Sequence, residues 1–108
     1  MVRAEHLHRC AEALARFPGH VASHQSAAAL HDMTIVLHPA ADVHLTAVDG
    51  APRSRRHPGV CLHHADPVIN NTVHFQGMRA TTLPRTIADV LRTSRLPHSV
   101  GLIDAAAR

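Results

Sequence analysis

TTLPRTIADVLR, residues 81–92, is the stretch of the sequence that decides the fold. Thr82 can cap a helix, and Pro84 then falls in the first turn, where its missing N–H costs little. The apolar residues recur at helical spacing and predict one buried stripe, which consists of Leu83, Ile87, Val90 and Leu91. We therefore expect an amphipathic helix that packs across a small sheet.

Arg85 and Asp89 lie four residues apart on the opposite face of this helix. A solvated pair at that spacing contributes only about 0.2–0.5 kcal/mol, whereas removing one partner of a buried pair costs about 3–5 kcal/mol. Two interpretations follow from the sequence. In one, Asp89 orients the Arg85 guanidinium toward backbone carbonyls of the preceding hairpin; in the other, the pair belongs to a surface that binds a partner.

Two helices are predicted in the N-terminal part of the chain. Apolar residues recur at helical spacing over residues 4–17, and Pro18–Gly19 ends that helix. Ser23 is a suitable N-cap for a second, short helix that ends near Asp32.

The middle of the chain changes from helical to strand periodicity. Residues 42–48 alternate between apolar and polar, which is typical of a strand, and residues 60–65 predict a second strand that pairs antiparallel with the first. Residues 49–59 are rich in Gly, Pro and Arg and predict turn and loop. TVHF and MRATT flank Gln76–Gly77, a candidate tight hairpin, and residues 98–108 predict a further helix.

These elements predict one α+β domain over residues 1–108, with two N-terminal helices, a small antiparallel sheet of about four strands, and C-terminal helices packed on it. The chain has 108 residues with no Trp or Tyr and two Phe, so the core is modest and stability as a monomer is expected to be marginal. No apolar stretch is long enough to span a bilayer or to serve as a secretory signal. We expect a cytoplasmic protein with no membrane partner, whose Cys10 and Cys61 are reduced thiols without a metal or redox spacing.

The order of the motifs resembles a known family over about residues 4–108. It is the domain that follows the DNA-binding winged helix in AbiEi-like antitoxins and transcriptional regulators of actinobacteria, and that precedes a very-short-patch-repair-like endonuclease domain in other relatives. The residues that carry the resemblance are Ser23, His24, His44, Thr81, Arg85, Thr86 and Asp89. Asp32 stands where the family usually has glycine, and His64 where it often has arginine.

The resemblance implies a non-catalytic regulatory or antitoxin-like module of a type IV toxin–antitoxin or related DNA-associated system. In that scheme the antitoxin counters a nucleotidyltransferase toxin without forming a stable complex, so no toxin-binding residues are implied. We expect neither the winged helix nor the nuclease domain among residues 1–108. Two alternatives stay open: a truncated, inactive remnant of an endonuclease-domain protein, and a histidine-rich protein that binds metal or responds to pH.

The twelve histidines raise the question of a metal site. His24 and His31 share one helix face, and His44 and His63 could be neighbours across two strands. Structural zinc usually has four ligands in compact pairs, with Cys common among them, and the sequence contains no C-x-x-C. We therefore expect hydrogen-bonded histidines and neither a metal nor another cofactor.

The remaining candidates concern nucleic acid, self-association and catalysis. Arg53, Arg55 and Arg56 form a basic loop that could contact phosphate and bind nucleic acid weakly and in a salt-dependent way. The C-terminal helix could contact a second copy of the chain or a missing domain. Cys10 with His6, and Ser23 with His24, have no nucleophile elbow or oxyanion motif, so we expect no enzyme.

Overall fold

The fold combines a mixed sheet with three helices, and the computed structural model describes residues 2–33, 41–51, 53–75 and 77–93. The predicted segments 34–37 and 98–108 lie outside the described residues. The elements, in chain order, are α1 (Val2–Arg16), β1 (His20–Ala22), α2 (His24–Leu30), β2 (Val43–Ala47), β3 (Arg55–His57), β4 (Val60–His63), β5 (Thr72–Phe75), β6 (Met78–Thr81) and α3 (Leu83–Thr93).

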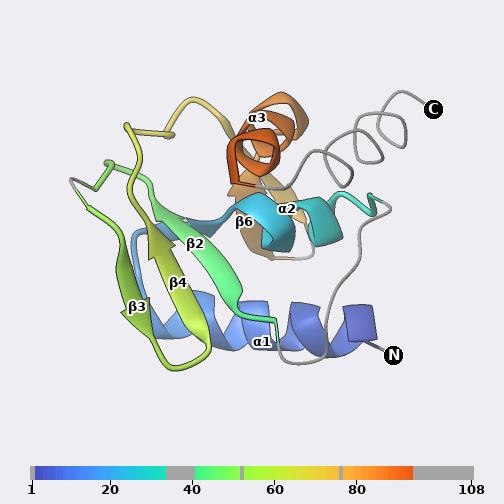
Figure 1. The fold of residues 1–108 in the computed structure, drawn as a ribbon. Coiled ribbons are helices and arrows are strands. Elements are labelled where there is room, and N and C mark those ends of the chain that lie inside the picture. Colours follow the sequence, from blue (N-terminus) through green and yellow to red (C-terminus); the bar gives the residue numbers. More distant parts are fainter. Residues whose placement is uncertain (1, 34–40, 52, 76, 94–108) are drawn as a thin grey trace.

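The six strands form one sheet in the order β3-β4-β2-β1-β6-β5 (Figure 1). Neighbouring strands run antiparallel in the pairs β3–β4, β2–β1 and β6–β5, and parallel in the pairs β4–β2 and β1–β6. The predicted small antiparallel sheet of about four strands is therefore wrong. The hairpin prediction is confirmed, because β5 and β6 pair antiparallel and Gly77 takes the left-handed conformation with φ +81°.

The predicted antiparallel pairing of residues 42–48 with residues 60–65 is also wrong, and β3 is the reason. β3 lies within residues 49–59, which were expected to form only turn and loop. It runs antiparallel to β4 and returns the chain along the outer side of that strand. β4 therefore starts at the same end as β2 and runs parallel to it, with Val43 opposite Val60 and His44 opposite Cys61.

β1 joins the two halves of the sheet, although the sequence pattern does not predict it. It has only three residues, which is too short for a periodic pattern. Val21 pairs antiparallel with Thr46 of β2, while Ala22 pairs in parallel with Ala80 of β6. The chain leaves β1 directly into α2, so Ser23 and His24 lie at the point where the strand turns into a helix.

The two predicted N-terminal helices are present, and they pack around the sheet. Figure 1 shows α1 and α3 on opposite sides of the strands, with α2 next to β2. α1 contributes Cys10 and Ala13 to the core cluster that also contains Val43 and Leu45 of β2. Because side chains alternate along a strand, His44 and Thr46 point to the other face of the sheet.

The predicted helix over residues 81–92 is confirmed, but its buried stripe differs from the prediction. Thr86, Asp89 and Val90 are buried, whereas Leu91 is 38 % exposed. Polar contacts hold this face, since the Thr81 and Thr86 hydroxyl oxygens lie 2.7 Å apart and Thr86 also donates to the Thr82 carbonyl at 2.8 Å. Among the described residues, no helix has both the length and the apolar character that a bilayer span requires.

Candidate functional site

Four side chains of β2 and β4 meet on the face of the sheet that is turned away from α1. Register places His44 opposite Cys61 and Thr46 opposite His63. Alternate residues of a strand point to the same side, so these four side chains share one face of two adjacent strands. The parallel pairing therefore brings two imidazoles and one thiol together without any loop.

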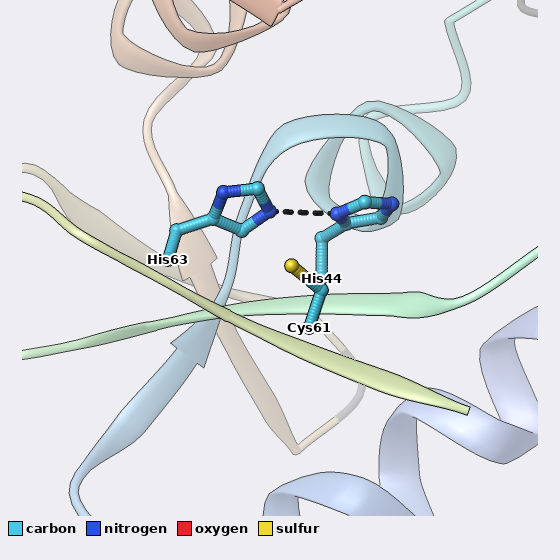
Figure 2. Close-up of side chains that lie close together, drawn as sticks. All are labelled: His44, Cys61 and His63. Carbon is cyan, nitrogen blue, oxygen red and sulfur yellow. Dashed lines mark hydrogen bonds between the residues drawn. The ribbon is translucent and has the colours of Figure 1, made fainter. Parts of the chain in front are cut away.

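The imidazoles of His44 and His63 are in direct contact. Nδ1 of His44 lies 2.7 Å from Nε2 of His63, and the rings stack at an interplanar angle of 28°. Figure 2 shows this contact from the side, with the Cys61 sulfur on the same side of the two strands. One ligand atom each from His44, Cys61 and His63 lies within 4.8 Å of both others. We call these residues together with His24 the histidine–cysteine cluster.

His24 completes the cluster from the start of α2. Its ring stacks on that of His63, with centroids 3.6 Å apart, and its Nδ1 lies 2.9 Å from the Ser23 hydroxyl oxygen. The Ser23 oxygen also accepts a hydrogen bond from the Thr46 hydroxyl at 2.7 Å. His24 has φ +52°, a left-handed conformation that few residues other than glycine adopt. The contacts around its ring hold it in that conformation.

Burial keeps the histidines of the cluster neutral at neutral pH. It lowers the pKa of His24 to about 3 and that of His44 to about 4, and the positive charge of a protonated neighbouring histidine acts in the same direction. Burial also lowers the pKa of His63, although the Asp89 carboxylate acts against that shift. Burial raises the pKa of the Cys61 thiol. The neutral imidazole is the form that can bind a metal or accept a hydrogen bond.

A buried carboxylate of α3 completes the charged environment of the cluster. Asp89 is 1 % exposed, and its Oδ1 lies 3.1 Å from Nε of Arg85. Arg92 also pairs with the same carboxylate, but its side chain is 63 % exposed. Asp89 is thus a desolvated anion whose better-buried partner is Arg85.

A second polar junction lies behind the cluster, where α1, α2 and β2 meet. The Ser26 hydroxyl accepts a hydrogen bond from the His44 backbone N–H at 2.8 Å and lies 2.9 Å from Nε2 of His6. His6 is fully buried, and burial, followed by the charge of Arg9, lowers its pKa to about 4.

The residues that carry the family resemblance all lie in or beside these buried contacts. Ser23, Thr81 and Thr86 are fully buried, and His24 and Asp89 are nearly so. His44 and Arg85 are half-buried. The expected pairing of Arg85 with Asp89 is present, and it is this carboxylate that the Arg85 guanidinium contacts.

Other candidates from the sequence lie apart from the cluster. Arg53, Arg55 and Arg56 are exposed, and Arg56 donates to Asp42 at 2.5 Å. His31 closes α2, with Nε2 2.8 Å from the Thr81 carbonyl oxygen, so it does not join His24 in a common site.

Sequence reasoning found the neighbourhood of His44 and His63 but missed Cys61. The expected cue was a C-x-x-C pair, which is typical of zinc sites in turns. The cue actually present is C-x-H, since Cys61 and His63 are two residues apart in a strand and so share a face. It becomes informative only once the parallel register with His44 is known.

Comparison of the chain with protein-family models, with curated proteins and with solved structures finds no match.

Proposed function

We propose that this domain is a non-catalytic regulatory module of a DNA-associated system, of the antitoxin type that its motifs resemble. The observation that carries the proposal is the burial of the motif residues. Ser23, Thr81, Thr86 and Asp89 are each at most 1 % exposed, and they are engaged in hydrogen bonds or ion pairs with one another or with neighbouring elements. Residues used in this way specify a scaffold and are not available to a substrate.

The candidate nucleophiles support the same proposal. The Ser23 hydroxyl is fully buried between His24 and Thr46, and Cys10 is fully buried in the core. Burial raises the pKa of the Cys10 thiol, which disfavours the reactive thiolate. His6, the base considered with Cys10 from the sequence, has its Nε2 2.9 Å from the Ser26 hydroxyl oxygen.

Neutralisation of a toxin is the direct test. We expect expression of this chain to restore growth of a bacterial host that produces a nucleotidyltransferase toxin of the type IV class. Purified protein should show no nuclease or esterase activity. Growth rescue should be weakened in Arg85→Ala, which destabilises the domain by removing the ion-pair partner of the buried Asp89, and kept in the exposed-site control His74→Gln. Failure of rescue by a folded, well-expressed wild-type chain, or hydrolysis that copurifies with it, would overturn the proposal.

The association with DNA gives a separate prediction, which concerns the basic loop. Arg53 and Arg55 are exposed, whereas Arg56 pairs with Asp42. In the double variant Arg53→Ser/Arg55→Ser, we expect weaker retention of duplex DNA, and the slope of log K against log salt should become shallower by about 0.9 for each phosphate that the loop no longer binds. The matched control Arg3→Ser/Arg16→Ser removes the same charge from α1. Equal weakening in the two variants would show that only net charge matters and would exclude the loop as a DNA-binding element.

The proposed self-association through residues 98–108 lies outside the described residues.

A further inference from the structure

Three potential metal ligands converge on one point from two hydrogen-bonded strands. They are Sγ of Cys61 and one ring nitrogen each of His44 and His63, all within 4.8 Å of one another (Figure 2). The ring nitrogens that face each other are His44 Nδ1 and His63 Nε2, which lie 2.7 Å apart. β2 and β4 form the interior of the sheet, flanked by β1 on one side and β3 on the other. The backbone that presents the three atoms is therefore fixed by hydrogen bonds on both sides, so little ordering is needed when a ligand binds.

The donor set matches the chemistry of zinc. Imidazole nitrogen and thiolate sulfur are the ligands that zinc prefers, at about 2.0–2.1 Å for nitrogen and about 2.3 Å for sulfur. Oxygen ligands, which calcium and magnesium require, do not belong to this group of three. Two nitrogens on one tetrahedral zinc would be about 3.3 Å apart from those bond lengths. The observed 2.7 Å separation between His44 Nδ1 and His63 Nε2 needs only a small opening of the ring pair.

We propose that His44, Cys61 and His63 form a zinc site in which His44 Nδ1, Cys61 Sγ and His63 Nε2 bind the ion. In the metal-free protein one of the two facing nitrogens carries the hydrogen that the rings share. On binding, that ring moves its hydrogen to its other nitrogen, so both facing nitrogens present lone pairs to the ion. The Cys61 thiol releases one proton to solvent and binds as thiolate, which leaves the site with a net charge of one positive unit.

The surroundings of the three ligands suit an ion of this charge. The ring of His24 stacks on His63 and covers one side of the site, and the Asp89 carboxylate exerts a favourable electrostatic effect on a positive charge at His63. The surroundings of metal-binding histidines tune the affinity of a site for its ion. Three protein ligands leave the fourth tetrahedral position for water or another small ligand, which is the arrangement of an open zinc site.

Titration with Co²⁺, a spectroscopic substitute for Zn²⁺, tests the proposal on the whole untagged chain. We expect one Co²⁺ per chain, with the near-ultraviolet absorption of a thiolate–cobalt bond and visible bands of a tetrahedral site, and displacement by one equivalent of Zn²⁺. Cys61→Ser should abolish the thiolate absorption. Loss of a group that only supports a metal ligand typically weakens metal binding by roughly 10- to 100-fold. His44→Gln and His63→Gln each remove a ligand itself, so each should weaken Zn²⁺ binding by more than that.

Matched controls separate this site from the other cysteine and from surface histidines. Cys10→Ser removes the other thiol of the chain, and His8→Gln and His74→Gln remove exposed imidazoles; all three should retain both the stoichiometry and the absorption. Circular dichroism verifies that each variant is folded. Binding with no thiolate absorption, absorption that survives Cys61→Ser, or binding that is lost equally in the His8 and His74 variants would each overturn the proposal.

Discussion

Replacing Arg85 with alanine is expected to lower the free energy of unfolding by about 3 kcal/mol, the lower end of the range for removing one partner of a buried ion pair. The reason is the burial of Asp89, whose side chain is 2 % exposed while that of Arg85 is 22 % exposed. Without Arg85, the carboxylate stays desolvated, and among the described residues the remaining ion-pair partner is the largely exposed Arg92. Urea denaturation, followed by circular dichroism at neutral pH, measures the change.

Two matched variants distinguish this cause from a general loss of charge or of packing. Arg92 pairs with the same carboxylate from an exposed position, so Arg92→Ala should cost less than about 1 kcal/mol. Adding Asp89→Asn to Arg85→Ala should recover part of the lost stability, because the amide removes the uncompensated charge. An Arg92→Ala variant that is as unstable as Arg85→Ala, or a double variant less stable than Arg85→Ala alone, would contradict the assignment.

Acidification from pH 7 to pH 5 is expected to destabilise the metal-free protein by about 2 kcal/mol through His6 alone. The imidazole is fully buried between Arg9 of its own helix, Ser26 of α2 and the neighbouring His44 of β2, and its pKa is lowered from 6.5 to about 4. Above pH 6.5 the folded and unfolded states are both neutral at this position, so the full stability is present. As the pH falls from 6.5 to 4, only the unfolded state gains a proton, and stability is lost over that window.

His6→Gln tests this prediction because the glutamine amide is neutral at every pH and can keep a contact with Ser26. Denaturation midpoints with a metal chelator present, measured between pH 7 and pH 4.5, should depend less steeply on pH in this variant. At pH 5 the difference between the pH effects on wild type and variant should be about 2 kcal/mol. His74→Gln, which changes an exposed histidine of β5, should leave the wild-type slope unchanged. An unchanged slope in His6→Gln would refute the role of His6.

Local periodicity predicted the helices and most of the strands. The α3 pattern is strong because apolar and charged residues separate cleanly over three turns, and the Gln76–Gly77 turn between β5 and β6 has the glycine that positive φ requires. β1 and β3 were missed because each has three residues, and β3 carries Arg55 and Arg56 in place of apolar residues. Missing β3 also reversed the predicted direction of β4 relative to β2, because the chain runs back along β3 before it enters β4.

The site was less predictable than the fold because it depends on register. His44 and Cys61 face each other only in the parallel alignment of β2 and β4. In the predicted antiparallel pairing the same residues would have met other partners. The buried face of α3 was also not predictable from periodicity alone. The apolar pattern favoured Leu83, Ile87 and Leu91, whereas the structure buries Thr86 and Asp89. The hydrogen bond of Thr86 and the ion pair of Asp89 determine which face of the helix is buried.

The position of β3 at one edge of the described sheet has a consequence for aggregation. The outer side of an edge strand presents free backbone amides and carbonyls, which can recruit a strand from another molecule and start fibre growth. Arg55 and Arg56 are exposed on this short strand and place two guanidinium groups at this edge of the sheet. The positive charges on two copies of β3 repel each other, so we expect this edge of the sheet to resist amyloid-like stacking. We expect the same below pH 6, where protonation of the unfolded state at His6 lowers the free energy of unfolding.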